Sequence, residues 1–467
     1  MIKHYSMKNY MLIIIALLLH ITAKTQVTFE KIITSGSTET AWSVIRTFDG
    51  GYAFLGNFGA SPGYDRWLVK TNNMGDTLWS KTFRGTGGDL GDRALVQAVD
   101  HGFTFITNRN GKAGLLHVSS SGDSLWEKEL FSGIGLSVAR TSSWNYIVTG
   151  QNATGPVIHL ALAGTDGNLS WDKTYHVSGP FSGCRSWTVM EIPGIGYVAA
   201  GEIMSNYGYS IPFVFKAGPD GDSTWCRSYS WFMGAAIYSA DTILNGDIYV
   251  CGIEHNTDGN TMVMRLNASG DTVWTSVQTA PRSQFFNSIR STGDGGAIAC
   301  GSYSNSSDTS RVYLTKYSAA GSIAWQKKIG NYKNSYGLSV EPAYDNGYII
   351  CGQVQETVSS GQHALLIKTD ANGNFAGIEN HKYVNGYYFY PNPASDITIL
   401  SPGSISNGNP VIIRLYDLFG REVITLQATQ SLKGYTLDVA DLPDGVYLAA
   451  IESDGRVIER AKLVKHH

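Results

Sequence analysis

The feature of this sequence that most constrains its fold is a repeated pair of glycine and tryptophan. In six places a glycine that ends a short turn is followed, four residues later, by a tryptophan. The tryptophans lie roughly 50 residues apart, a period typical of structures built from repeated units. The pairs are Gly75/Trp79, Gly122/Trp126, Gly167/Trp171, Gly221/Trp225, Gly270/Trp274 and Gly321/Trp325.

A second repeated feature, a turn followed by a β-rich run, lies upstream of these pairs and occurs seven times. The runs are residues 51–56, 102–105, 145–148, 196–199, 247–250, 296–299 and 347–350. A further strand precedes each run, as at residues 41–45. The turn of each glycine–tryptophan pair joins two more strands in a hairpin, so each period holds four strands. Four strands per unit of roughly 50 residues predict an all-β fold, a seven-bladed β-propeller. The main alternative, a parallel β-helix, has much shorter repeats.

The seventh repeat lacks its tryptophan, because four residues after Gly373 stands Gly377. Residues 27–32 form a spare strand near the N-terminus, and Phe29 in it lies one period before Trp79. We therefore predict that this strand completes the seventh blade and closes the ring. Closure would remove the exposed strand edges that invite aggregation.

The composition supports many short strands and excludes a dedicated nucleic-acid binder. Charged residues make up 16% of the chain, against about 25% in an average soluble domain. The formal net charge is −3, whereas nucleic-acid-binding domains carry a basic face. No nucleic-acid partner is expected.

The first residues are typical of a secretory signal peptide. Lys3 and Lys8 precede an apolar run, residues 11–21, and the small residue Ala23 follows it. The run is too short for a membrane-spanning helix, which needs about 20 residues. We predict a signal peptide over residues 1–23 and no transmembrane segment in the mature chain. The alternative is an uncleaved membrane anchor.

The pattern changes again near residue 385, where two prolines break any strand ladder. Beyond residues 390–393 the chain shows alternating strands, turns that end at Gly420 and Gly445, and a basic last strand. The predicted organisation is a propeller over residues 27–384, a linker over 385–394 and a small β-sandwich over 395–467.

This tail resembles the type A C-terminal sorting domain of the type IX secretion system of Bacteroidota. The resemblance rests on residues 390–393, 415–423, 442–447 and 462–465. It implies export by the signal peptide, passage across the outer membrane by the type IX machinery, and a secreted or cell-surface location. The alternative is an ordinary accessory sandwich. The implied sorting residues are Tyr390, Pro391, Asn392, Pro393, Gly420, Gly445, Lys462 and Lys465.

The glycine–tryptophan hairpins also resemble those of quinoprotein propellers, in which a tryptophan on the outer strand docks onto the next blade. That resemblance covers the hairpins alone. No feature for binding the quinone is present, so no cofactor and no activity are carried over.

The face that carries the longer loops is predicted to bind a ligand, since loops carry function on rigid scaffolds. Aromatic side chains anchor protein contacts and stack on sugar rings, so we expect a binding module for protein or glycan. The loops of this face also include Tyr64. The ligand-binding candidates are Tyr207, Tyr209, Trp231, Phe232, Phe285, Phe286, Tyr303, Glu202, Glu254 and His255.

An exported hydrolase or lyase active on polysaccharide, with its site on the same face, is the alternative function. Acid–base chemistry would need convergent titratable groups. The sequence does not show convergence, and no residue is assigned a catalytic role. The groups available are Asp89, Asp92, Glu202, Glu254 and His255.

Two polar columns appear when the repeats are aligned. The first-strand column forms a polar ring at the axis or marks small residues where strands converge. The second-strand column contacts a ligand or bonds to nearby backbone. The first holds Ser43, Ala94, Ser137, Thr188, Ser239, Ser288 and Ser339, and the second holds Asn57, Asn108, Gln151, Glu202, Ile253, Ser302 and Gln353.

No histidine or cysteine spacing indicates a metal site. Residues 220–222 (Asp-Gly-Asp) could bind calcium, although hairpin turns use these residues routinely. The five cysteines are predicted to be small buried residues without disulfides, because equivalent positions on neighbouring blades lie too far apart.

Overall fold

The structure is a computed structural model of the chain. It describes residues 26–34, 37–59, 64–85, 91, 93–152, 155–243, 245–254, 259–279, 284–304, 310–330, 332, 334–355, 361–375, 388–390, 392, 394–401, 411–428, 435–453 and 456–466. The chain divides into two compact units, residues Met1–Ala376 and Gly377–His467. The predicted signal peptide lies outside the described residues.

The first unit consists of strands that occupy four successive positions in each repeat. The first strands are β2 (Glu39–Arg46), β6 (Leu95–Gln97), the second half of β9 (Ser124–Arg140), β13 (Phe181–Ile192), β17 (Ala235–Thr242), β21 (Gln284–Ser291) and β25 (Ser335–Pro342). The second strands are β3 (Tyr52–Phe58), β7 (Phe103–Arg109), β10 (Tyr146–Asn152), β14 (Gly196–Ser205), β18 (Ile248–Glu254), β22 (Ala297–Ser304) and β26 (Tyr348–Val354).

The third and fourth strands complete the set. The third strands are β4 (Asp65–Thr71), β8 (Lys112–Val118), β11 (Val157–Ala163), β15 (Ser210–Ala217), β19 (Asn260–Leu266), β23 (Ser310–Tyr317) and β27 (His363–Thr369). The fourth strands are β5 (Thr77–Phe83), the first half of β9, β12 (Leu169–His176), β16 (Ser223–Ser228), β20 (Thr272–Gln278), β24 (Ile323–Ile329) and β1 (Phe29–Ile33).

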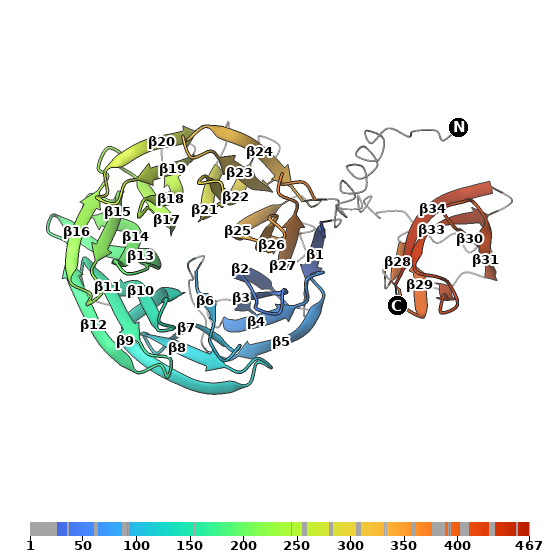
Figure 1. The fold of residues 1–467 in the computed structure, drawn as a ribbon, viewed down its shortest axis with the longest axis horizontal. Helices are drawn as coiled ribbons and strands as arrows, with labels where there is room; N and C mark the ends of the chain where they lie inside the picture. The colour runs from blue at the N-terminus through green and yellow to red at the C-terminus, as the bar shows by residue number, and fades with distance from the viewer. Residues whose placement is uncertain are drawn as a thin grey trace, which may run out of the picture. The chain divides into compact units, whose positions relative to one another are not determined.

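These strands form antiparallel sheets arranged in a ring, with the first strands innermost (Figure 1). Five sheets have four strands each, and strands β6–β12 form one seven-stranded sheet. In that sheet β9 is the outer strand of one repeat and the inner strand of the next, pairing with β8 and then with β10. The described part of the unit is all-β, and its ring of radial sheets is that of a β-propeller.

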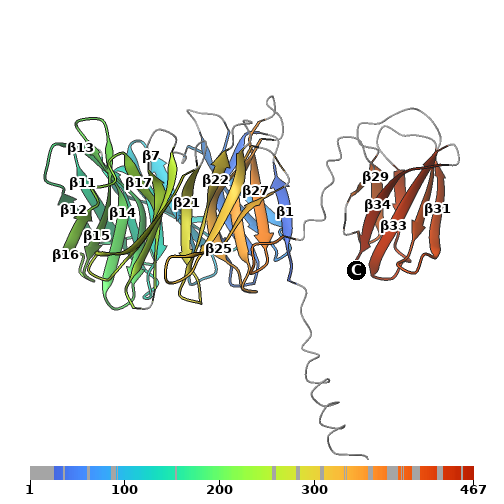
Figure 2. The ribbon, with the colours of Figure 1, turned by 90° about the horizontal axis from the view of Figure 1, so that it is seen from above.

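The N-terminal strand lies where the missing fourth strand of the last repeat is needed. β1 pairs antiparallel with β27, with Phe29 opposite Lys368 and Ile33 opposite Ala364. The sheet order is β1-β27-β26-β25, so one sheet joins the two ends of the unit (Figures 1 and 2). This is the pairing that the closure hypothesis requires.

Each docking aromatic side chain lies against the turn glycine of the next repeat around the propeller. A side chain added at Gly122 would come within 2.9 Å of the Trp79 ring, and one at Gly75 within 2.5 Å of the Phe29 ring. The contacts are Phe29/Gly75, Trp79/Gly122, Trp126/Gly167, Trp171/Gly221, Trp225/Gly270, Trp274/Gly321 and Trp325/Gly373. The glycine is needed for close approach as well as for its positive φ, and Phe29 occupies the same place as the tryptophans.

A charged contact accompanies several of these aromatic contacts. A cation two residues after the aromatic residue pairs with the acid that follows the neighbour's glycine. Lys81 lies 3.2 Å from Asp123, and Lys31 pairs with Asp76 at the closing sheet. These side chains are partly exposed, so each pair contributes at most about 1 kcal/mol.

Replacing a docking glycine should cost more than replacing a glycine that shares only its backbone conformation. Gly167 has φ 77° and a side chain there would come within 2.5 Å of Trp126, whereas Gly50 has φ 84° and nothing within 4 Å. Both alanine variants pay the strain of positive φ, about 1 kcal/mol, but Gly167→Ala must also displace the ring. Thermal denaturation should show a clearly larger loss for Gly167→Ala, and equal losses would contradict the docking role.

The tight turns between first and second strands carry aspartates that lysines of the third strands bind. Lys70 lies 2.8 Å from Asp49, and Lys316 lies 2.8 Å from Asp294. Burial alone would raise the pKa of Asp49, but hydrogen bonds from Lys70, Thr47 and the backbone lower it to about 2. The pKa of Asp294 is likewise lowered to about 2, despite burial, by hydrogen bonds from its lysine and turn.

These aspartates predict a loss of stability in acid. A carboxylate with a depressed folded-state pKa stabilises the fold above its ordinary pKa, 3.8, and loses that contribution as the pH falls toward about 2. We expect the melting temperature to fall between about pH 4 and pH 2. The Asp49→Asn/Asp294→Asn double variant should fall less steeply over that window, and an identical slope would contradict the role assigned to the pair.

The C-terminal unit is a small sandwich of two sheets, ordered β28-β29-β32 and β31-β30-β33-β34. Its core includes Phe389, so residues 388–390 of the predicted linker form a strand of this unit. The strands are β28 (Tyr388–Tyr390), β29 (Ile397–Ser401), β30 (Val411–Tyr416), β31 (Glu422–Ala428), β32 (Tyr435–Asp438), β33 (Gly445–Ser453) and β34 (Arg456–Lys465).

Candidate functional site

The hydroxyl column of the first strands joins neighbouring sheets to one another. Ser43 Oγ accepts a hydrogen bond from the amide of Ala94 at 3.2 Å, and Ser137 Oγ accepts one from Val189 at 3.2 Å. Ser339 Oγ accepts from the amide of Val44 at 3.4 Å, which links the last repeat to the first. These hydroxyls are buried, so the column is a structural belt between inner strands, and burial keeps it away from a ligand.

The polar column of the second strands makes similar contacts. Asn108 donates to the carbonyl oxygen of Gly135 at 3.0 Å and accepts from its amide at 2.8 Å. Gln353 accepts from Thr40 at 3.1 Å, across the junction of the last and first repeats. Both contacts run to the inner strand of the next repeat, which favours the bonding interpretation of this column.

The aromatic candidates of one sheet gather at its long-loop edge. Tyr207 and Tyr209, between β14 and β15, have ring planes 14° apart and centroids 6.3 Å apart. Trp231 and Met233 lie between β16 and β17. Tyr207, Trp231 and Met233 are 75%, 64% and 60% exposed. We call the four side chains Tyr207, Tyr209, Trp231 and Met233 the aromatic patch.

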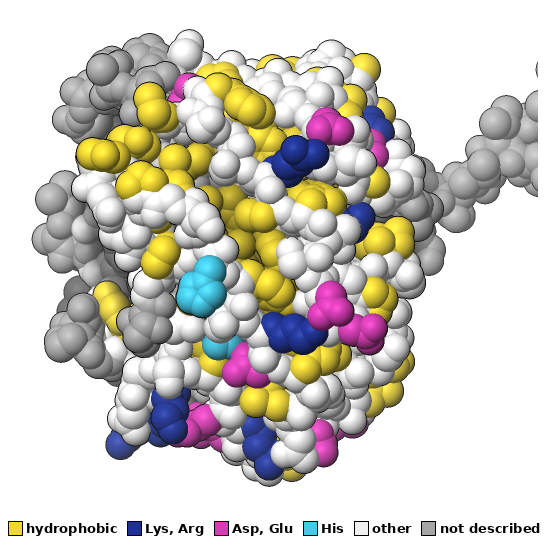
Figure 3. Space-filling view, turned by 90° about the vertical axis from the view of Figure 1, so that its left-hand side faces the viewer, with side chains coloured by type: hydrophobic (Ala, Val, Ile, Leu, Met, Phe, Trp, Pro, Cys, Tyr) yellow, Lys and Arg dark blue, Asp and Glu magenta, His cyan; other side chains and the backbone are white. Residues whose placement is uncertain are grey.

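Two backbone hydrogen bonds hold the segments of the aromatic patch side by side. The amide of Gly234 donates to Ser210 O at 2.8 Å, and the amide of Tyr229 donates to Pro212 O at 2.9 Å. The buried Tyr229 ring also packs edge-on against Trp231, with centroids 5.3 Å apart. Figure 3 shows this side of the ring, with hydrophobic side chains gathered at its upper left edge. The patch is therefore exposed but firmly supported.

The other aromatic candidates are placed differently. Phe286 is fully buried and Phe232 is 9% exposed, so both rings pack in the core. Phe285 on β21 is half-buried. Tyr303 lies under the ammonium of Lys328, 3.4 Å from its ring centroid. Tyr64 precedes β4 and is half-buried.

The carboxylate candidates contact neighbouring polar groups. Glu202 is 9% exposed and accepts hydrogen bonds from Ser210 at 2.6 Å and from Trp187 at 3.3 Å. Its carboxylate also lies 3.5 Å from Arg185. Glu254 accepts a hydrogen bond from Asn260 at 3.3 Å. The three remaining groups, Asp89, Asp92 and His255, lie outside the described residues.

The calcium candidate, the turn at residues 220–222, has a cation beside its oxygens. The Lys173 ammonium lies 2.6 Å from Asp222 and 2.7 Å from the carbonyl oxygen of Asp220. Within the described ranges, no group of three or more His, Cys, Asp or Glu side chains could hold a metal ion. No helix of the described part is long and apolar enough to cross a membrane.

All five cysteines are free thiols. Four are buried, as predicted, but Cys226 is exposed. It lies on the outer strand β16, whose side chains are mostly exposed. The prediction of five buried cysteines was wrong at this position.

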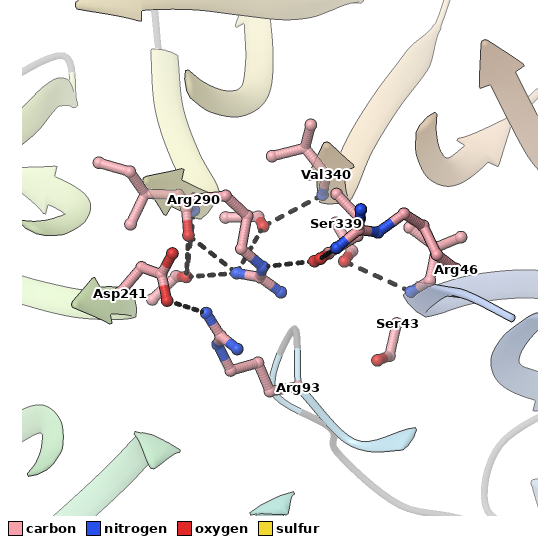
Figure 4. A network of polar contacts seen from close by, with 12 residues as sticks. Ser43, Arg46, Arg93, Asp241, Arg290, Ser339 and Val340 are labelled. Carbon is pink, nitrogen blue, oxygen red and sulfur yellow. Dashed lines mark hydrogen bonds and ion pairs between the residues drawn. The ribbon is translucent and has the colours of Figure 1, made fainter. Parts of the chain in front are cut away.

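The sequence interpretation missed a charged cavity at the axis, on the tight-turn face. Four arginines from four different repeats line it, and we call them the axial arginines: Arg46, Arg93, Arg140 and Arg290. Figure 4 shows Arg290 and Arg93 converging with Asp241 near the axis. The sequence does contain a signal for this cavity. An arginine follows a hydroxyl-column serine by two or three residues in three repeats, at Arg46, Arg140 and Arg290.

Part of the predicted sorting signal forms a structural contact in the C-terminal unit. Asn392 Nδ2 donates to the carbonyl oxygen of Lys462 at 2.7 Å, and its Oδ1 accepts from the amide of Val464 at 2.8 Å. Gly420 has φ 78° in a turn, and Gly445 begins β33. Lys465 ends β34 and is 1% exposed. Pro391, Pro393 and the side chain of Tyr390 lie outside the described residues.

Comparison with known families identifies this tail. Residues 371–466 match the secretion system C-terminal sorting domain. The chain is therefore exported through the type IX system to the cell surface or the extracellular space, and the secretion machinery is a partner. No curated protein matches the chain.

Several solved structures share a general likeness with the chain. A protein of unknown function from Bacteroides caccae is 12% identical, with TM-score 0.38, over 63% of this chain and 94% of that one. Sqt1 from Chaetomium thermophilum is 10% identical, with TM-score 0.46, over 75% and 87%. The β-propeller domain of the Trilobed protease from Pyrococcus furiosus is 9% identical, with TM-score 0.43, over 70% and 95%. Scores this low carry no argument about function.

Proposed function

We propose that the chain is an exported binding module whose contact surface is the aromatic patch. The observation that carries the proposal is the exposure of Tyr207, Trp231 and Met233 on adjoining, hydrogen-bonded segments of one sheet. Exposed apolar side chains gathered in one place mark interaction sites more often than scattered ones do. Tyrosine and tryptophan also lose little conformational entropy on binding and bury a large area.

The structural support beneath the patch favours a pre-organised contact. Trp231 rests edge-on against Tyr229, whose hydroxyl donates to the carbonyl oxygen of Gly270 at 2.9 Å. A side chain held in its binding orientation pays less ordering entropy when a partner arrives. The ligand would be a protein surface or a glycan, the two classes to which exposed tyrosine and tryptophan are suited.

The test measures binding of the mature chain, residues 24–467, to a glycan array and to a panel of cell-surface proteins. Replacing Tyr207 and Trp231 together with alanine should weaken the detected interaction by at least about tenfold, since hot-spot truncations cost about 2 kcal/mol or more. The matched control is Leu78→Ala/Leu125→Ala, which removes two side chains, each 57% exposed, from outer strands. Binding that survives loss of the patch, or no binding in either assay, would contradict the proposal.

A further inference from the structure

The axial cavity on the tight-turn face is a second candidate site, separate from the aromatic patch. It has a volume of about 280 Å³ and is lined by the ends of β2, β6, β9, β21 and β25 with their turns. Within an antiparallel sheet of consecutive strands, the turns from first to second strand lie at the opposite end from the long loops. The cavity therefore opens away from the loops that connect second to third strands.

Two axial arginines are held by carboxylates. Arg290 is 4% exposed, and its Nε donates to Glu341 at 2.8 Å. Arg93 Nη2 lies 2.6 Å from Asp241, whose other oxygen accepts from the amide and hydroxyl of Ser291. The Nε of Arg93 is buried and has no hydrogen-bond acceptor among the described residues. A buried N–H group that makes no hydrogen bond destabilises the fold. A ligand that supplied an acceptor would remove this cost.

The positive charges of the other two axial arginines are poorly neutralised by carboxylates. Arg46 comes no closer than 3.8 Å to Glu341. Arg140 donates to the backbone oxygen of Gln97 at 3.0 Å, and no carboxylate of the described residues forms an ion pair with it. Burial lowers the pKa of Arg140 below its ordinary value, because removing a cation from water disfavours its charged form.

Aromatic rings stack on these two guanidinium groups at the mouth of the cavity. The guanidinium of Arg140 lies 4.2 Å from the ring centroid of Trp144 and 5.4 Å from that of Phe48. That of Arg46 lies 4.8 Å from the centroid of Tyr344. Stacking occupies the faces of a guanidinium and leaves its N–H donors, which lie in its plane, free to bind an anion. Phe48 and Tyr344 are 42% and 57% exposed and edge the opening.

The balance of charges around the cavity limits the charge of the anion that it can bind. The only carboxylates among the described residues that line this cavity and the hollow beside it are Glu341, Asp241 and Glu191. Glu191 already accepts the amide and hydroxyl of Ser142. Four guanidinium groups against three carboxylates leave one positive charge. A monoanion would neutralise it, whereas a phosphate dianion would overcompensate it.

We propose that this cavity binds a monoanionic group, a carboxylate or a sulfate ester, carried on a sugar ring. The axial arginines hold the anionic oxygens, and the exposed rings of Phe48 and Tyr344 contact the body of the sugar. A guanidinium matches the geometry of such an oxyanion through parallel hydrogen bonds. The volume lies near the lower end of the range for small-molecule sites, which suits a single ring.

The experiment titrates the mature chain by calorimetry with three sugars: trigalacturonate, a sulfated galactose trisaccharide, and the same galactose trisaccharide without sulfate. We expect binding of an acidic trisaccharide, weakening with salt, and none of the neutral one. The carboxylated and sulfated probes distinguish the two sources of the anion. Binding of neither acidic probe by the folded protein would overturn the proposal.

Variants locate the binding. Arg140→Gln should weaken it by about tenfold or more, because a charged hydrogen bond contributes about 1.5–3 kcal/mol. Arg46→Gln is the second variant, since this partly exposed side chain forms only a long ion pair, with Glu341. The matched control is Arg227→Gln, an outer-strand arginine that is 53% exposed. If the two cavity variants bind as well as the control variant does, the proposal is wrong. Tyr207→Ala/Trp231→Ala should leave this binding unchanged, which separates it from the patch.

Discussion

Replacing Phe29 with alanine is expected to lower the melting temperature of the propeller by roughly 5–10 °C. Phe29 is 8% exposed and packs against Gly75 of the neighbouring sheet and edge-on toward Tyr52, with centroids 6.4 Å apart. Truncating a buried phenylalanine costs about 3–5 kcal/mol, and each kcal/mol corresponds to a shift of about 2–4 °C or less in a chain of this size. The measurement is thermal unfolding followed by calorimetry.

Two further variants make this prediction specific. Phe29→Trp should keep nearly the wild-type melting temperature, because tryptophan occupies this place in the other six contacts. Phe375→Ala should cost much less than Phe29→Ala, since Phe375 is only partly buried against its core cluster. If Phe29→Ala and Phe375→Ala behave alike, the aromatic contact does not close the ring.

Removing residues 27–34 should have a larger effect of the same kind. The deletion removes β1, which leaves β27 paired with β26 on one side and without a partner at its outer edge. An exposed strand edge is a template for pairing with another chain. We expect a less stable protein that associates, which light scattering would detect. A truncated protein that stays monomeric and equally stable would show that the last repeat supplies its own outer strand.

Deleting the tail from Tyr388 onward should abolish export and leave a soluble propeller in the periplasm. Most of the matched sorting domain, residues 371–466, lies in the deleted segment, and the propeller belongs to a separate compact unit. The change is expected to be nearly complete, because the signal and the folded cargo are separate units. Immunoblots of periplasm, cell surface and medium would measure it.

The matched experiment adds the tail to a protein that does not carry it. Residues 371–466 fused to a periplasmic reporter should move that reporter to the cell surface or medium. Truncated propeller found outside the cell, or a fused reporter that stays in the periplasm, would contradict the role of the tail.

The strand order and the sorting tail could be predicted because their signals are local and repeated. A turn glycine with positive φ, such as Gly122, and a docking aromatic such as Trp79 recur at one spacing, and Phe29 falls in register with them. Residues 388–390 were harder to place. Their pairing with β29 depends on a core contact of Phe389 with residues far along the chain.

The candidate sites depend on contacts between distant repeats, which a single sequence does not show. The second role of the glycines, close approach to an aromatic side chain of the preceding repeat, becomes visible only when neighbouring repeats are in place. The axial arginines likewise come from four different repeats, and Arg93 and Asp241 are brought to 2.6 Å from repeats far apart in sequence. Phe286 looked like an exposed loop aromatic, but its strand turns the ring into the core.

Hydrogen exchange at β1 tests the central claim, a ring closed by its own N-terminal strand, most directly. In the folded protein, a peptide covering residues 26–34 should exchange as slowly as the outer strand β24 (Ile323–Ile329), because β1 pairs with β27 along its whole length. Protected amides of paired strands open only by local or global unfolding. Exchange of this peptide at the rate of an unstructured segment, with β24 still protected, would contradict the account.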